Sequence, residues 1–133
     1  MHVLNRSTLG EGRFDVEHSA ASTLSPVRIL QIGDGNFLRG FADWMIDVAN
    51  GAALFNAEVI VAQPLPRGIA GLLNAQQGVY TVLLRGVQDG AVLESRRVVS
   101  CISRALDPYS EWASMLELAR DPLLRFVISN TTE

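Results

Sequence analysis

The spacing of apolar residues along the chain changes period several times, and each period predicts one type of element. Residues 27–32 are apolar at most positions, which predicts a central strand covered on both faces. Residues 57–62 repeat this pattern around a Val-Ile-Val centre. Between them, over 36–50, apolar positions recur at helical spacing, and Gly51 follows as a natural stop. This part of the chain is therefore predicted to form a strand, a helix and a second strand.

The predicted helix over 36–50 has two unlike faces. We expect its apolar side to be buried and the side with Arg39, Asp43 and Asp47 to face water. The apolar side consists of Phe37, Phe41, Met45 and Val48, joined by Leu38, Ala42, Ile46 and Ala49.

The middle of the chain predicts a loop, a short helix and a hairpin. Prolines place a loop at 63–68, and a short helix is expected over 69–76. Two strands, 79–85 and 91–102, are joined through 86–90, whose Asp-Gly pair is typical of a tight turn. We interpret this hairpin as an insertion or as an antiparallel edge of the same sheet.

A second long helix begins at Asp107, which offers a side-chain cap, with Pro108 in the first turn. Its apolar face consists of Trp112, Met115, Leu116 and Ala119, and Asp121 and Pro122 end it. Residues 124–129 then predict a further buried strand.

Alternating strands and helices predict an α/β fold: a mostly parallel sheet with helices on both faces and a β-hairpin insertion. We place this domain at 27–133. Residues 1–26 show no sustained periodicity and end in a run of small polar residues, so an irregular leader is expected there.

The junction between the first strand and the helix carries the candidate chemistry. Gly33 and Gly35 would let the backbone bend sharply and approach a ligand, and the free N–H groups of the helix start suit a diphosphate. Leu38 occupies the position of the third glycine in the dinucleotide-binding pattern, so a purely structural turn is the alternative. The candidate cofactor-binding residues here are Ile32, Gly33, Asp34, Gly35, Asn36, Phe37, Leu38 and Arg39.

Arg39 has two plausible roles. It could pair with Asp43 on the helix surface, or it could contact a phosphate or substrate from the first turn of the helix.

The ends of the other predicted strands complete the candidate site. An acidic residue usually follows the second strand of an NAD-binding domain and holds the ribose hydroxyls, but this chain has Gln63, which leaves NAD and NADP as alternatives. Arg67 could meet a 2′-phosphate or be an ordinary exposed loop residue. Asn130 and Thr131 could hold the nicotinamide ribose or amide, or simply cap the strand.

Composition excludes several classes of function. The chain has 133 residues, is 48% hydrophobic and carries a net charge of −3, so we expect one domain and no nucleic-acid partner. A single cysteine, Cys101, and two leader histidines, His2 and His18, predict neither a disulfide nor a metal site. No apolar run is long enough to span a bilayer, and no signal peptide is evident, so a soluble cytoplasmic protein is expected. Every basic residue is arginine, so chemistry that needs a lysine cannot run on this chain alone.

Several stretches resemble the N-terminal domain of the long-chain mannitol dehydrogenase family. They are Gln31 to Phe41, Asp43 with Trp44, and Arg125 to Glu133, with further likeness at Leu4-Asn5-Arg6, Gly78-Val79-Tyr80-Thr81 and Tyr109-Ser110-Glu111. The resemblance implies a Rossmann-type fold, NAD as cofactor and reversible hydride transfer to a sugar acid, most closely the interconversion of D-tagaturonate and D-altronate. In this family a helical C-terminal domain supplies the substrate pocket and a lysine acid/base.

The same resemblance implies that these residues are an incomplete N-terminal domain, able to bind dinucleotide but not to turn over substrate. We also expect uncovered apolar surface and self-association, while the oligomeric state stays open. Three alternatives stay open: a fructuronate reductase or mannitol dehydrogenase domain, an S-adenosylmethionine-dependent methyltransferase, and a non-catalytic nucleotide-binding module. Trp44 and Trp112 are interpreted as packing residues rather than ligand contacts.

Overall fold

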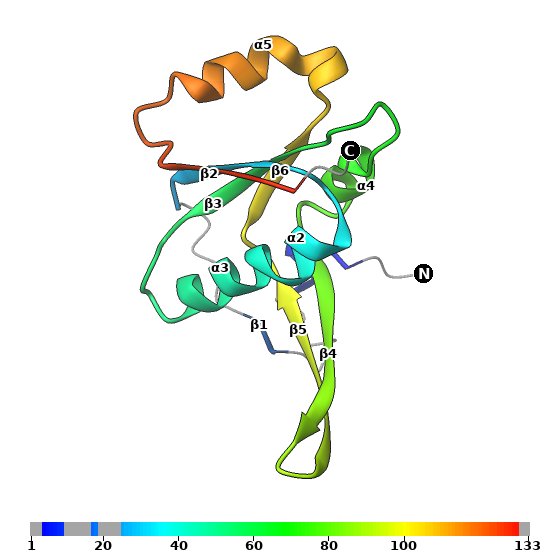
Figure 1. Ribbon diagram of the computed structural model, residues 1–133. Coiled ribbons are helices and arrows are strands. Elements are labelled where there is room, and N and C mark those ends of the chain that lie inside the picture. Colours follow the sequence, from blue (N-terminus) through cyan, green and yellow to red (C-terminus); the bar gives the residue numbers. More distant parts are fainter. Residues whose placement is uncertain (1–3, 10–16, 19–24, 131–133) are drawn as a thin grey trace.

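A four-stranded parallel sheet organises the domain, in the strand order β6-β3-β2-β7 (Figure 1). The computed structural model describes residues 4–9, 17–18 and 25–130. The sheet strands are β2 (Val27–Ile32), β3 (Glu58–Ala62), β6 (Ile102–Leu106) and β7 (Phe126–Ser129). β2 lies between β3 and β7, so the predicted central strand is confirmed.

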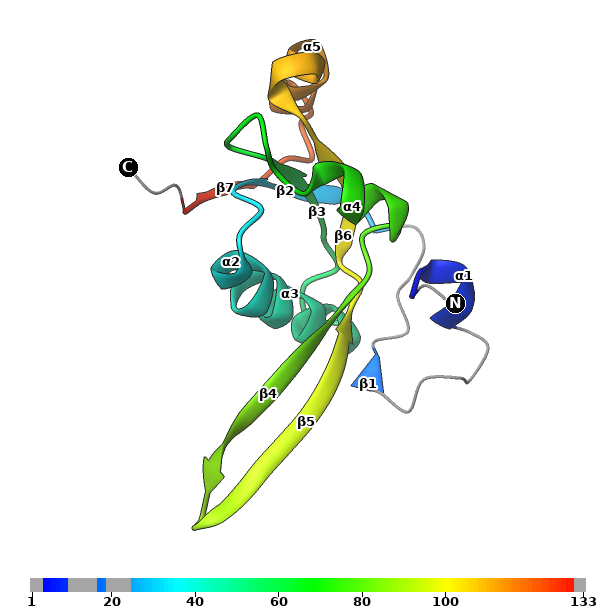
Figure 2. The ribbon, with the colours of Figure 1, turned by 90° about the vertical axis from the view of Figure 1, so that its right-hand side faces the viewer.

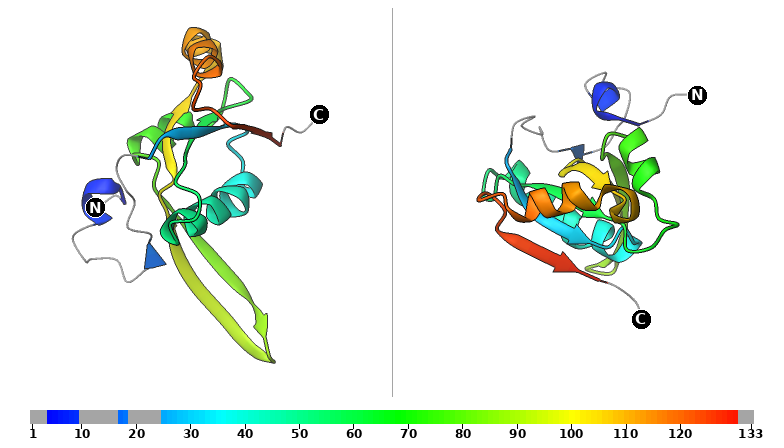
Figure 3. Two further views of the ribbon diagram at one scale, coloured as in Figure 1. Left: turned by 90° about the vertical axis from the view of Figure 1, so that its left-hand side faces the viewer. Right: turned by 90° about the horizontal axis from the view of Figure 1, so that it is seen from above.

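Helices cover both faces of this sheet, as predicted. α2 (Asn36–Gly40) and α3 (Ala42–Gly51) lie on one face, and α5 (Pro108–Ala119) crosses the other (Figures 1 and 3). The short helix α4 (Ala70–Ala75) packs against β6. Asp107 caps α5 by accepting a hydrogen bond from the Tyr109 N–H at 3.0 Å, with proline at the first turn.

Alternate residues of the strands supply two cores. One lies toward α3 and α4 and includes Ile29, Val59 and Val61. The other lies toward α5 and includes Leu30 and Ile60. This alternation is the reason that the strands read as nearly continuous apolar runs.

The hairpin forms a separate arm. β4 (Tyr80–Gln88) and β5 (Ala91–Val99) are antiparallel and extend far from the parallel sheet (Figure 2). They form a three-stranded sheet with β1 (Glu17–His18), which pairs with β5 in parallel. The hairpin is therefore an insertion, not an edge of the main sheet. The division between an irregular leader, residues 1–26, and the domain, residues 27–133, stays a prediction. The leader segment contains the short helix α1 (Arg6–Leu9) as well as β1.

The predicted strand over 91–102 is wrong at its end. β5 stops at Val99, and β6 starts independently at Ile102 as the third parallel strand of the main sheet. The ladder breaks because the Ser100 N–H donates to Asp47 Oδ1 at 2.9 Å instead of to a neighbouring strand.

The predicted helix over 36–50 is divided at Phe41, and only part of its expected apolar face is buried: Leu38 is 6% exposed and Ile46 packs against the core. The Phe37 side chain is 61% exposed and Met45 is 44% exposed, whereas Asp43 is 0% and Asp47 1% exposed. Apolar spacing therefore identified the helix but only part of its buried face, and it missed the burial of Asp43 and Asp47.

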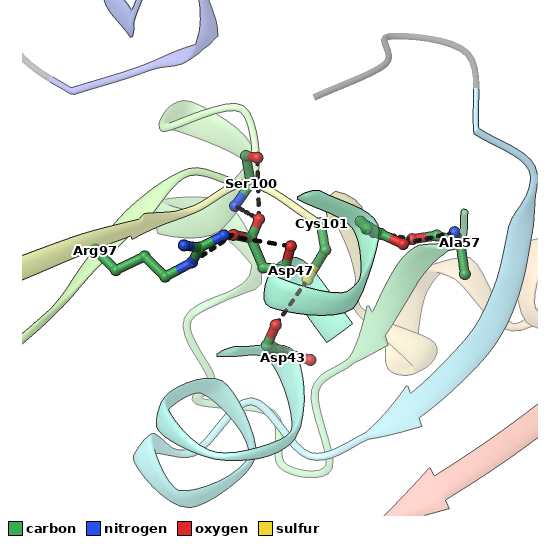
Figure 4. A network of polar contacts seen from close by, with 7 residues as sticks. Asp43, Asp47, Ala57, Arg97, Ser100 and Cys101 are labelled. Atoms are coloured by element: carbon green, nitrogen blue, oxygen red, sulfur yellow. Dashed lines mark hydrogen bonds and ion pairs between the residues drawn. The ribbon is translucent and has the colours of Figure 1, made fainter. Parts of the chain in front are cut away.

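Polar partners explain why α3 buries its carboxylates (Figure 4). Asp47 Oδ2 lies 2.9 Å from the Arg97 guanidinium of β5, and Asp47 Oδ1 accepts from Ser100. Asp43 Oδ2 accepts from Gln31 Nε2 at 3.3 Å and from the Tyr80 hydroxyl at 3.2 Å, and the Asp43 backbone carbonyl accepts from the Cys101 thiol at 3.3 Å. Buried charges are tolerated where partners of this kind surround them. The network attaches α3 to the base of the hairpin.

The final strand is also less buried than predicted. β7 is an edge strand, and Phe126 and Val127 are exposed. On α5, Leu118 is buried whereas Trp112 and Leu116 are exposed, so the face predicted for that helix is only partly correct. No helix in the described part of the chain is both long and apolar enough to cross a membrane.

Candidate functional site

The turn after β2 needs a glycine at its first position. Gly33 has φ +134°, a conformation that residues with a side chain rarely adopt. A Cβ there would lie 3.0 Å from Leu38 Cδ1 and 3.1 Å from the Asn130 carbonyl oxygen. The Gly33 N–H donates to the Ala62 carbonyl at 3.0 Å and ties the turn to the end of β3. Gly33 is thus required by the fold itself.

Gly35 is different, because nothing in the described part of the chain requires it. Its φ and ψ of −74° and 166° are open to any residue, and a Cβ built there meets no atom of the described residues within 4 Å. It is the N-terminal cap position of α2 and has no side chain to satisfy the first N–H groups of the helix. The bare backbone at Gly35 therefore faces open space.

That open space is a cavity of about 400 Å³ at the carboxyl end of the parallel strands. It is lined by Gly33, Asp34, Gly35, Asn36, Phe37, Pro64, Leu65 and Asn130. Asn130 reaches it because β7 pairs in parallel with β2, which brings the end of β7 beside the glycine turn. Ligands of open α/β sheets bind in a crevice at this edge.

Arg39 and Leu38 contact the turn on the side away from the cavity. Arg39 Nε donates to the Asp34 carbonyl oxygen at 3.0 Å and Nη2 donates to Asn36 Oδ1 at 2.6 Å. The guanidinium also lies over the Tyr80 ring, 5.4 Å from its centre. Leu38 is buried beneath Gly33. Neither side chain lines the cavity, so both preorganise its backbone.

A buried carboxyl group lies beneath this support. The Tyr80 hydroxyl donates to the Arg39 carbonyl oxygen at 2.9 Å and contacts Asp43 Oδ2 at 3.2 Å, and Gln31 Nε2 donates to the same oxygen at 3.3 Å. Burial raises the pKa of Asp43 to about 6, against smaller opposing effects of these hydrogen bonds. Burial and the nearby Asp43 raise the pKa of Tyr80 far above its usual value.

A second cavity of about 410 Å³ adjoins the first at Pro64. It lies between the ends of β2 and β3 and the start of α5. Its lining is mostly apolar: Ile32, Ala62, Gln63, Pro64, Pro108, Tyr109, Trp112 and Met115. An apolar slot with two aromatic side chains suits a planar ring.

The structure brings most of the predicted site residues to these two cavities and adds others. Pro64, Leu65 and Tyr109 were not predicted, and Trp112, interpreted as a packing residue, instead lies 56% exposed on the second cavity. The signal in the sequence was an aromatic residue in the first turns of a helix that follows a parallel strand. Thr131 lies outside the described residues, and Arg67 is exposed in its loop.

No family model matches the chain. Curated relatives named altronate oxidoreductase match most of it: one from Phocaeicola vulgatus is 48% identical over 117 residues, 88% of this chain and 24% of that protein. Others from Halalkalibacterium halodurans and Bacillus subtilis are 47% and 46% identical over 84% of this chain. The predicted resemblance is confirmed, and the chain spans about a quarter of the length of these relatives.

Solved structures share the fold. A Pseudomonas fluorescens mannitol 2-dehydrogenase, in a ternary complex with NAD and D-mannitol, superposes with a TM-score of 0.84 at 20% identity. It matches 97% of this chain and 26% of its own. A D-sorbitol dehydrogenase superposes with a TM-score of 0.80 at 19% identity over 98% of this chain and 27% of its own. The predicted Rossmann-like fold is thereby confirmed.

Proposed function

We propose that this chain, which is similar to altronate oxidoreductases over most of its length, is the N-terminal cofactor-binding part of an NAD-dependent oxidoreductase. The reaction would interconvert D-tagaturonate and D-altronate. A sugar-acid substrate, bound largely by residues outside this sequence, and a cytoplasmic location belong to the same proposal.

The observation that carries the proposal is the contrast between the two glycines of the turn. Gly33 is explained by its positive φ and close neighbours, but Gly35 has an ordinary conformation and no neighbour within 4 Å of a Cβ position. Gly35 lies on the wall of a cavity, and the fold gives no reason for a glycine there. The absence of a side chain leaves room for a ligand to come close to the backbone. A diphosphate at the backbone of the turn is such a ligand.

The two adjoining cavities fit the parts of a dinucleotide. The diphosphate would lie along the backbone at Gly35 and Asn36 in the first cavity. The adenine ring would lie against Tyr109 and Trp112 in the second cavity. Asn130, which lines the first cavity beside the turn, would approach the nicotinamide side, and Thr131 is proposed for the same role.

The chain's own residues bind and orient the cofactor but do not handle the proton. When bound, NAD supplies the hydride chemistry. The Tyr80 hydroxyl is engaged by Arg39 and Asp43, and burial raises its pKa, so it is unsuited to proton transfer. Because the sequence has no lysine, we infer that these residues alone bind dinucleotide without turnover.

Calorimetric titration of the folded 133-residue chain with NADH tests this proposal, with S-adenosylmethionine as the competing ligand class. We expect NADH to bind with 1:1 stoichiometry and S-adenosylmethionine to give no heat of binding. Binding of S-adenosylmethionine alone would indicate a methyltransferase domain. Binding of neither ligand would contradict the dehydrogenase proposal for this chain.

A further inference from the structure

Two side chains from the ends of neighbouring strands hold the same backbone segment. Asp34, which follows β2, accepts a hydrogen bond from the Ile69 N–H at 2.7 Å. Gln63, which follows β3, accepts one from the Ala70 N–H at 3.2 Å. The segment is the start of α4, whose cap residue Ile69 has no side-chain hydrogen bond of its own. Asp34 and Gln63 together therefore fix the loop that forms one wall of the cavity.

Gly68 shows how close these two side chains are. A Cβ on Gly68 would lie 2.6 Å from Gln63 Oε1 and would overlap Asp34 Oδ2. Since both oxygens crowd the same point, the Asp34 carboxylate lies beside the Gln63 amide. The acidic residue that usually selects NAD follows the second strand, which is the position of Gln63 here.

One oxygen of the Asp34 carboxylate holds the side chain in place, and the other oxygen is available to accept a hydrogen bond from a ligand. Oδ2 accepts from Ile69, whereas Oδ1 makes no hydrogen bond to any residue that the structure describes. The side chain is half-buried and lines the first cavity. Its position is fixed, unlike that of Arg67, which is exposed in the adjoining loop.

We propose that Asp34 supplies, from the glycine turn, the carboxylate that selects NAD over NADP. This inference rests on the proposed function, since it concerns the adenosine ribose of the same cofactor. A carboxylate at this position accepts a hydrogen bond from a free 2′-hydroxyl and repels a 2′-phosphate. Gln63, which is neutral, then serves to hold the loop and needs no charge.

The test compares the affinities of NADH and NADPH for the wild-type chain and for D34N, D34E and D89N. D34N keeps an oxygen for the Ile69 N–H but removes the charge, whereas D34E keeps the charge on a longer side chain. D89N is the matched control, because it removes one negative charge at the exposed tip of the hairpin, where its φ of 52° suits asparagine. Circular dichroism verifies that each variant is folded.

We expect the wild-type chain to bind NADH at least about tenfold more tightly than NADPH. In D34N this ratio should fall to about threefold or less, mainly because NADPH binds more tightly, while D34E and D89N keep most of the wild-type ratio.

An unchanged ratio in folded D34N would overturn the inference while leaving the proposed function intact. Equal binding of both cofactors by the wild type, or a preference for NADPH, would overturn the inference and also contradict the proposed dependence on NAD. If the ratio of NADH to NADPH affinity fell as much in D89N as in D34N, the inference would also be overturned, because the loss of one negative charge anywhere would then explain the effect. Failure of the folded wild type to bind either cofactor would overturn the proposed function, and the inference with it.

Discussion

The Arg97 guanidinium lies 2.9 Å from Asp47 Oδ2, although the two residues are fifty positions apart. Asp47 is on α3 and Arg97 on β5, and their side chains are 1% and 14% exposed. The pair joins the helix that follows the candidate cofactor turn to the base of the hairpin arm. It is one of several polar contacts that hold the acidic side of α3 in the interior.

Replacement of Arg97 should therefore destabilise the whole domain. In R97A the buried Asp47 carboxylate loses the guanidinium, and breaking such a pair costs about 3 kcal/mol or more. Urea unfolding followed by circular dichroism measures the change. R96A is the matched control: Arg96 is 62% exposed in its pair with Glu94, and its loss should cost less than about 1 kcal/mol. Equal unfolding midpoints for the two variants would contradict this account.

The Asp43 carboxyl should make stability depend on pH. Its pKa is 3.8 in the unfolded chain and about 6 in the fold, so between these values the folded state holds a proton that the unfolded state has released. The contribution of Asp43 to the free energy of unfolding is fully present below about pH 4. It falls by roughly 3 kcal/mol as the pH rises through about 6.

The D43N variant isolates this effect from other carboxyl groups, including Glu58, whose pKa burial also raises. Because the amide does not titrate, the unfolding free energy of D43N minus that of the wild type should rise by roughly 3 kcal/mol between about pH 4 and pH 7. A flat difference for D43N would mean that Asp43 titrates normally in the fold.

Gly35 offers the sharpest test of where the ligand lies. A Cβ there meets no atom of the described residues within 4 Å, so G35V should fold with near wild-type stability yet bind NADH at least about tenfold more weakly. G86V makes the same change on the hairpin, where a Cβ also meets nothing within 4 Å, and should bind normally. Unchanged affinity in G35V would show that the ligand does not approach this turn.

Trp112 should report the occupation of the second cavity. Its indole is 56% exposed on the cavity wall, whereas Trp44 packs against the core beneath the sheet. Addition of non-fluorescent NAD should therefore quench tryptophan emission in the wild type and in W44F, and the response should be lost in W112F. A response that persists in W112F and disappears in W44F would place the adenine elsewhere.

Local signals in the sequence were sufficient for much of the fold. The predicted limits of β2 are those observed, and Asp107 with Pro108 starts α5 as expected. Strand periodicity, capping and turn chemistry depend on residues a few positions apart, so they can be read from the chain. The glycine turn was also located correctly at the end of the first strand.

The walls of the site depended on distant contacts. Asn130 meets Gly33 only through the parallel pairing of β7 with β2, and Trp112 reaches the second cavity only because α5 crosses the sheet. Interpreting Trp112 as a packing residue was wrong because helical spacing shows which residues share a face, not what that face contacts.

The sequence by itself determined most of the elements, the parallel α/β class and the turn at Gly33 and Gly35, because these follow from local periodicity and backbone freedom. Tertiary structure alone decided that α3 buries Asp43 and Asp47 and exposes Met45, and that α2 exposes Phe37. The physical reason is that the cost of burying a carboxylate depends on its partners, and Arg97, Ser100 and Tyr80 come from segments far along the chain.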